Sequence, residues 1–248
     1  MNNPKNIDLF SGVAKQYAAH RPTYPDSLFE FLAQEIKGKD VWDCGTGSGQ
    51  LAFGLAKRGF HVQATDISNK QIGAAPEHAQ ITYSTRNSYE TGFHNQRFDA
   101  VTVAQAVHWF DFDLFYKEVK RVLKPGGKIF IIGYGLIRGS ETFNQHLDKF
   151  YSQTLDGYWP EERKHIDSEY SDIPFIFEEI PFPKLNIEVN RTALEVIEYL
   201  KTWSAWQAFA EANGSEAIER LAQTLEKEIG PEPHLFTFPL FGRAGIIK

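Results

Sequence analysis

The stretch between residues 40 and 59 most constrains the fold of this chain. It begins as a short apolar strand, Asp40 to Cys44, continues through a loop with glycine at every second position, Gly45 to Gly49, and then becomes an apolar helical segment that Gly59 closes. Glycine tolerates left-handed backbone and lets a ligand approach the main chain closely. The sequence therefore predicts a strand, a ligand-binding loop and a helix in succession, although the same glycines could serve only a tight turn.

Strands and helices alternate through the remainder of the first half of the chain. A helix predicted over Phe112 to Leu123 ends at a Lys-Pro-Gly-Gly turn, because proline and glycine cannot continue it. Such alternation is typical of a parallel sheet covered by helices. Further strands are expected at 61–65, 81–85, 98–104 and 128–133, and further helices from Phe10 to Tyr17, from Asp26 to Ile36 and after Ser68.

The pattern changes beyond Gly139. A helical stretch to about Leu155 is followed by a polar, aromatic segment without clear periodicity, which we interpret as an insertion. Extended chain broken by two prolines comes next, then two helices, then an extended tail. The corresponding ranges are 175–189 for the extended chain, 192–212 and 215–229 for the helices, and 234–248 for the tail.

Charge and composition favour a small-molecule partner. The formal net charge is −6, so the chain lacks the basic footprint of a protein that binds nucleic acid or an anionic membrane. The single cysteine excludes an intrachain disulfide, and no signal peptide or membrane-spanning run is predicted, which indicates a cytoplasmic protein. The eight histidines show no metal-ligand spacing, so no metal site is predicted.

The end of the second predicted strand indicates a nucleoside ligand. Asp66 comes 21 residues after Gly45, where a carboxylate can accept hydrogen bonds from a ribose diol. A dinucleotide fingerprint would carry its third glycine at position 50, which is Gln50, so an NAD-dependent oxidoreductase is disfavoured. Asp43, two residues before Gly45, offers an acceptor for the ammonium group of a sulfonium amino-acid cofactor.

Several segments, taken in order, resemble the class I S-adenosylmethionine-dependent methyltransferases. Val41 to Gln50 is similar to their first motif and Asp66 to their ribose ligand, while Phe98 to Val101, Ala104 to Phe110 and Arg121 to Gly127 resemble their later signatures. The stretches 17–25 and 200–207 resemble, more narrowly, the small-molecule branch related to trans-aconitate methyltransferases.

The resemblance implies an α/β, Rossmann-like fold. The expected sheet has seven strands, is mostly parallel, carries helices on both faces and has a helical cap from the C-terminal half. The whole chain, 1–248, is then a single domain. Its expected parts are a cofactor-binding core with an N-terminal helical lid at 1–135, acceptor-capping insertions at 139–174 and 190–230, and the remaining strands at 175–189 and 234–248.

The resemblance also assigns residues to S-adenosylmethionine. Tyr17 and Arg21 would bind the cofactor's carboxylate, since arginine offers it a planar, bidentate fork. Ser88 would contact the adenine, although Tyr89 stands where the family often has an acid. Backbone groups after the fourth strand would border the methionine part. The predicted cofactor residues are Tyr17, Arg21, Asp43, Gly45, Thr46, Gly47, Gly49, Asp66, Ile67, Ser88, Tyr89, Ala104 and Gln105.

The acceptor is expected beside His108 and Trp109, which follow the fourth strand. A hydroxyl or amine acceptor needs a general base, for which His108 is the predicted catalytic residue, whereas a carboxylate needs none. Helix capping or core packing is the alternative role for His108. Trp203 is predicted to line the mouth of the acceptor pocket, with core packing again the alternative, because Trp203, Trp206 and Phe209 recur at helical spacing.

These observations predict transfer of a methyl group from S-adenosylmethionine to a carboxylate or hydroxyl oxygen of a small molecule. The alternative is a catalytically silent S-adenosylmethionine-binding regulator of the same fold, since fold alone does not separate the two. A base-modifying enzyme would carry a polar-Pro-Pro-aromatic turn after the fourth strand, where this chain has Ala104 to Val107.

Overall fold

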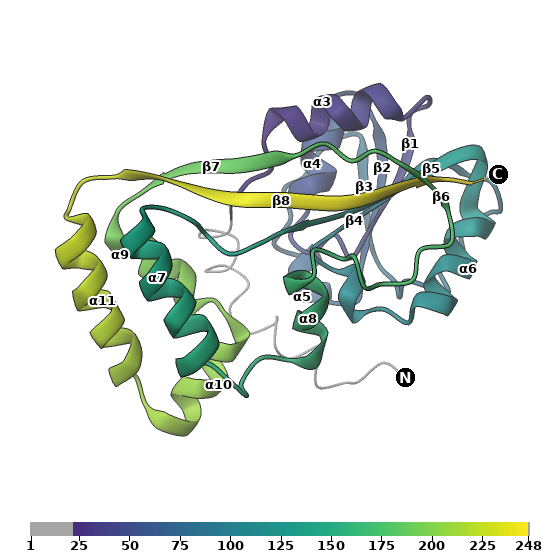
Figure 1. The fold of residues 1–248 in the computed structure, drawn as a ribbon. Coiled ribbons are helices and arrows are strands. Elements are labelled where there is room, and N and C mark those ends of the chain that lie inside the picture. The colour runs from purple at the N-terminus through teal and green to yellow at the C-terminus, as the bar shows by residue number, and fades with distance from the viewer. Residues whose placement is uncertain (1–21, 248) are drawn as a thin grey trace.

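The computed structural model describes residues 22–247 of the 248-residue chain. The helix predicted from Phe10 to Tyr17, and the predicted site residues Tyr17 and Arg21, lie outside the described residues. The described chain forms a sheet with helices on both faces and a group of helices at one end (Figure 1). The long strands β5, Leu123–Tyr134, and β8, His234–Ile246, extend from the sheet toward that group (Figure 1).

Five parallel strands form the first part of the sheet in the described chain. β1, Asp40–Cys44, lies between β2, His61–Asp66, and β4, Phe98–Ala104, and is parallel to both. β3, Ile81–Thr85, extends the sheet beyond β2, and β5 follows β4. The strand order therefore reverses between β1 and β4, and a crevice forms at the carboxyl ends of strands at such a point.

β8 is antiparallel to β5 and carries two short strands on its other side. β6, Glu178–Ile180, pairs with Ala244 to Ile246 of β8, and β7, Leu185–Arg191, pairs with His234 to Leu240. β6 and β7 thus share one position, so that the eight strands of residues 22–247 fill seven positions across the sheet. The predicted Rossmann-like fold with a seven-stranded, mostly parallel sheet is confirmed.

The two faces of the sheet pack against different helices. Successive side chains of a strand point to opposite faces. Val41 lies in one apolar cluster with α3, Asp26–Glu35, and α4, Gln50–Ala56. Its neighbour Trp42 lies in a second cluster with α6, Phe112–Val122. Both faces are therefore buried, as a parallel sheet requires.

The C-terminal half supplies the predicted helical cap. α7, Glu141–Lys149, continues into a π-helical turn, Phe150–Thr154, where one helix to Leu155 was expected. α11, Glu216–Ile229, packs against α7 and against α9, Ala193–Lys201. Figure 1 shows these helices beyond the end of the sheet, below the strands that lead to them.

The single helix predicted over 192–212 is interrupted. Thr192 and Glu195 form a capping box that starts α9, but Trp203 has extended backbone, φ −71° and ψ 133°. A new helix, α10, begins at Ser204 and runs to Asn213. The indole of Trp203 is buried among aromatic rings of the cap, so tertiary packing overrides the helical spacing of the sequence.

Four short helical elements complete the described chain. They are α5, Asn69–Ile72; η1, Val107–Trp109; η3, Glu161–Arg163; and α8, Lys164–Asp167. None of the helices in residues 22–247 has both the length and the apolar character that a bilayer-spanning segment needs.

Candidate cofactor and acceptor site

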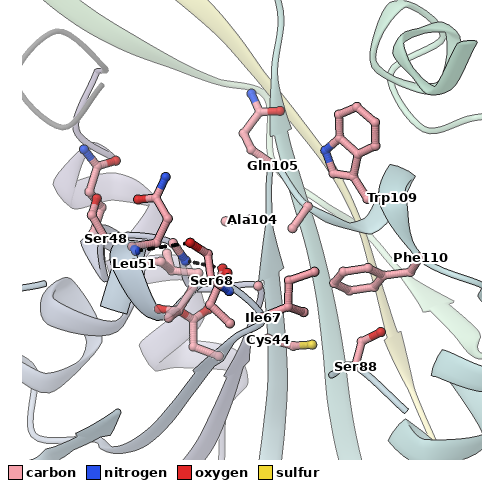
Figure 2. A pocket seen from close by; sticks show the side chains of 18 of the residues that line it. Cys44, Ser48, Leu51, Ile67, Ser68, Ser88, Ala104, Gln105, Trp109 and Phe110 are labelled. Atoms are coloured by element: carbon pink, nitrogen blue, oxygen red, sulfur yellow. Dashed lines mark hydrogen bonds between the residues drawn. The ribbon is translucent and has the colours of Figure 1, made fainter. Parts of the chain in front are cut away.

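A pocket lies at the carboxyl ends of β1, β2 and β4, where the strand order reverses. Side chains from the glycine loop, the end of β2, the loop after β3 and the segment after β4 converge on it (Figure 2). The residues predicted from the sequence that line this pocket are Asp43, Gly45, Thr46, Gly47, Asp66, Ile67, Ser88, Ala104, Gln105 and Trp109.

The loop between β1 and α4 has a backbone that favours glycine. Gly45, Gly47 and Gly49 all have positive φ, at +68°, +55° and +78°. A Cβ on Gly45 would lie 2.6 Å from the side chain of Ala106, whereas one on Gly47 would meet no atom within 4 Å. Gly47 thus presents bare backbone to the pocket, while Gly49 precedes α4 and is not a lining residue.

Asp66, at the end of β2, connects the glycine loop with the turn after β2 through hydrogen bonds. Its Oδ2 accepts a hydrogen bond from the Gly47 backbone N–H at 2.9 Å, and its Oδ1 accepts one from the Ser68 N–H at 2.8 Å. Burial raises the pKa of this carboxyl, and these two bonds oppose the rise. Each carboxylate oxygen can accept a second bond, so Asp66 is able to hold the loop and a ribose hydroxyl together.

Asp43 is a buried carboxylate beneath the loop, with 1% of its surface exposed. Thr46 donates to its Oδ2 at 2.5 Å, and Thr102 on β4 donates to its Oδ1 at 2.8 Å. Burial nevertheless raises the pKa of Asp43 to about 6. A cationic group entering the pocket would offset the cost of this buried charge.

A buried network fixes the loop between β3 and β4, which carries Ser88. Glu118 on α6 accepts from the backbone N–H of Thr91 at 3.1 Å and from its hydroxyl, while Arg121 donates to Glu118 Oε2 at 2.8 Å. Arg86 donates to the carbonyl of Thr91 and lines the pocket. Spacing in the sequence does not indicate this network, because its partners lie on separate elements.

Gln105 follows β4 with left-handed backbone, φ +53°, which is uncommon for a residue other than glycine. Its backbone N–H donates to the Ile132 carbonyl at 2.9 Å, and its Nε2 donates to the Tyr134 carbonyl at 3.0 Å. Both acceptor carbonyls belong to β5.

Tyr134, Tyr24 and Phe110 also line the pocket, and the sequence patterns do not predict them as site residues. Tyr134 is the one with a recognisable signal, because it ends a strand at the sheet edge where ligands bind.

Comparison with known proteins identifies the family of this chain. A family model described as a methyltransferase domain matches residues 42–131. A Dictyostelium discoideum protein described as a methyltransferase is 32% identical over 225 residues, which cover 89% of this chain and 86% of that protein. This chain belongs to the class I S-adenosylmethionine-dependent methyltransferases.

Solved structures agree with this assignment. A protein from Anaeromyxobacter dehalogenans, described as a type II methyltransferase, superposes with a TM-score of 0.85 at 36% identity, covering 91% of this chain and 97% of that one. Phosphoethanolamine N-methyltransferase 2 of Haemonchus contortus, in complex with S-adenosyl-L-methionine, gives a TM-score of 0.50 at 20% identity, covering 97% of this chain and 59% of that one, which shows the shared fold.

His108 of this methyltransferase does not line the pocket. Its ring is buried, its Nδ1 lies 3.2 Å from the hydroxyl of Tyr170, and burial lowers its pKa to about 3. A neutral imidazole with so low a pKa is a weak base. This geometry fits the core-packing alternative, and the catalytic role of His108 stays a prediction.

Trp203 and Tyr89 also lie off the pocket lining. Trp203 is 4% exposed, and its ring centroid lies 5.4 Å from that of Trp159 and 5.9 Å from that of Tyr199. Tyr89 is partly buried, and its backbone N–H donates to Asn87 Oδ1 at 3.1 Å. Among residues 22–247, no three histidine, cysteine or acidic side chains come together as metal ligands would.

Proposed function

We propose that this methyltransferase transfers a methyl group to an oxygen atom of a small-molecule acceptor, a carboxylate or a hydroxyl. The observation that carries the proposal is the polar, aromatic wall formed by Gln105, Trp109 and Tyr134 in the pocket that also contains the glycine loop. The net charge of −6 argues against a nucleic acid acceptor. The segments that resemble the trans-aconitate branch also favour a small acceptor.

The described residues fit the cofactor. Bare backbone at Gly47 leaves room for close approach, and Ile67, with 42% of its surface exposed, offers the adenine an apolar contact beside Ser88. When bound, S-adenosylmethionine supplies a methyl group on a positively charged sulfur. We assign the ribose hydroxyls to Asp66. Tyr17 and Arg21, outside the described residues, remain our candidates for the cofactor's carboxylate.

Asp43 completes the cofactor side of the pocket. A buried carboxylate with two threonine donors is a suitable counter-ion for the cofactor's ammonium group, directly or through the loop. Ala104 and the backbone of Gln105 border the same region from β4.

On the acceptor side, the protein contributes orientation and exclusion of water more than proton transfer. Trp109, Phe110 and Tyr134 form an aromatic wall. We assign to His108 the role of positioning Trp109. The centroids of the two rings lie 5.0 Å apart, and the hydroxyl of Tyr170 holds the imidazole through its Nδ1. Water at the mouth of the pocket would then act as the base that takes the proton of a hydroxyl acceptor.

The cofactor assignments are tested by calorimetric titration of the wild type with S-adenosylmethionine and S-adenosylhomocysteine, with NAD as the control ligand. Asp66→Ala removes charge-assisted hydrogen bonds and should weaken both sulfur ligands by about tenfold or more. Asp113→Ala, an exposed aspartate on α6, is the matched control and should bind as the wild type. Equal binding by Asp66→Ala and the wild type would refute the ribose assignment.

The acceptor is tested with methyl-labelled cofactor and a panel of small alcohols, carboxylic acids and amines. Methyl esters are hydrolysed by mild alkali and methyl ethers are not, so the release of label distinguishes the two acceptor oxygens. Label found only in nitrogen- or carbon-methylated products would contradict oxygen transfer. No transfer to any acceptor despite cofactor binding would favour the silent regulator.

A further inference from the structure

We infer that the side chain of Gln105 selects a hydroxyl, rather than a carboxylate, as the group that the acceptor presents beside Trp109. The inference rests on the proposed function and decides between its two acceptor oxygens. Three observations carry it: the fixed direction of the Gln105 amide, the position of the Trp109 indole nitrogen, and the charges of the pocket lining.

The direction of the Gln105 amide follows from its partner. The carbonyl oxygen of Tyr134 only accepts hydrogen bonds, so the group that faces it at 3.0 Å must be the amide nitrogen. The amide oxygen, Oε1, is then the opposite end of the group. Left-handed backbone at φ +53° and the bond from the Gln105 N–H to Ile132 hold the residue in this position.

The Gln105 amide and the Trp109 indole face one another across the pocket. In Figure 2 the amide oxygen of Gln105 is on the side of Trp109, and the indole nitrogen of Trp109 is turned toward Gln105. Both residues line the pocket. Trp109 is held in turn by the bond from its backbone N–H to the Ala106 carbonyl at 3.0 Å and by the ring of His108 behind it.

A hydroxyl matches this pair of groups. It can donate its hydrogen to Gln105 Oε1 while its oxygen accepts from the Trp109 N–H. A carboxylate has no hydrogen to donate and would place a negative oxygen against the amide oxygen, which is repulsive. The pair therefore both attracts the alcohol and rejects the acid.

The charged residues that line the pocket also favour a neutral hydroxyl over a carboxylate. Of the described residues that line the pocket, the charged ones are Asp43, Asp66 and Arg86. We assign Asp43 to the cofactor's ammonium group, whereas Asp66, whose assigned ribose partner is neutral, keeps its negative charge and disfavours a second anion. Arg86 belongs to the loop after β3, where its side chain donates to Ser84 Oγ and to the Thr91 carbonyl, and we assign that loop to the adenine.

The test measures binding of a matched pair of probes, benzyl alcohol and benzoate, to the protein saturated with S-adenosylhomocysteine. Saturation-transfer-difference NMR titrations detect such weak ligands without catalysis. In Gln105→Leu, which keeps the size of the side chain but removes its oxygen, we expect the alcohol to bind about three- to tenfold more weakly and benzoate to bind no more weakly than before. Gln34→Leu, the same change on the exposed surface of α3, is the control.

Equal binding of the alcohol to the wild type and Gln105→Leu, including none to either, would overturn the inference. So would benzoate binding to the wild type more strongly than the alcohol. If Gln105→Leu does not fold, Gln105→Met, an unbranched side chain that also lacks the amide oxygen, is measured with the same expectation. Calorimetry with S-adenosylhomocysteine separates the failure of this inference from the failure of the proposed function. If Gln105→Leu loses affinity for S-adenosylhomocysteine, the side chain belongs to the cofactor site and the inference is wrong. If the wild type has no affinity for S-adenosylhomocysteine, the proposed function itself is refuted.

Discussion

Replacing Asp43 with asparagine should stabilise the ligand-free protein while weakening its cofactor site. The folded state buries the Asp43 carboxylate, and loss of hydration disfavours its charged form. Asparagine has the same size and removes the charge. Its amide can keep both contacts, because the hydroxyls of Thr46 and Thr102 are able to donate or to accept.

The magnitude follows from the pKa of Asp43. Burial raises this pKa from 3.8 to about 6, and the difference corresponds to about 3 kcal/mol at about 1.4 kcal/mol for each unit. Because the folded state binds the proton more tightly than the unfolded state, the cost is absent below pH 3.8, grows between the two values and is complete above pH 6. At about pH 8, Asp43→Asn should therefore be more stable by about 3 kcal/mol, or about 6 °C in Tm for a chain of this length.

The assay is urea unfolding of the wild type and Asp43→Asn between about pH 4 and pH 8, with S-adenosylhomocysteine titrated separately by calorimetry. We expect the difference in unfolding free energy to increase with pH and then to level off, and the affinity for the ligand to fall. Asp156→Asn, which removes an exposed carboxylate from the turn after the π-helical segment, is the control. A stability difference that is the same at every pH, or an asparagine variant less stable at pH 8, would refute the reasoning.

Two further substitutions and one labelling experiment test other parts of the structure. Glu118→Gln weakens the buried contact with Thr91, so we expect a loss of about 1.5–3 kcal/mol in urea unfolding and weaker binding of S-adenosylhomocysteine; unchanged affinity would disconnect this network from the site. Gly54→Ala would place a Cβ 2.0 Å from the Phe29 ring, so we expect a loss of about 1–3 kcal/mol in stability and a lower Tm. An unchanged Tm would show that α4 can shift away from Phe29 without cost. Burial raises the pKa of Cys44 well above its usual value, so a thiol reagent should react slowly at pH 8 until urea is added; rapid labelling of the folded protein would contradict this.

The cofactor half of the fold was predictable because its signals are local. The bounds predicted for β1, β3 and β4 agree with the structure, since β1 and β4 are largely apolar, β3 is rich in β-branched and aromatic residues, and glycine or polar turn residues bound all three. The position of the pocket follows from the parallel order of those strands. Asp66 lies in it for the same reason, at the end of β2 beside the glycine loop.

The cap was less predictable because distant contacts decide its shape. Trp203 has the spacing of a helical residue, yet its ring packs on Tyr199 and Trp159 and its backbone is extended. Glu169 and Tyr170 have left-handed backbone, φ +54° and +61°, with no glycine to indicate it. The buried position of Tyr170 against His108, 62 residues earlier, accompanies that conformation.

The same geometry explains why two neighbours in the sequence, His108 and Trp109, do not share a site. They lie on the 3₁₀ turn η1, where three residues complete one turn and consecutive side chains point about 120° apart. Val107 accordingly enters the apolar cluster under α6, His108 faces Tyr170, and Trp109 reaches the pocket. Residues three apart share a direction on such a turn, and Ala106 indeed lines the pocket with Trp109. In our proposal, an acceptor beside Trp109 is oriented by Gln105 across the pocket, while the imidazole of His108 contacts the indole of Trp109 from outside the pocket lining.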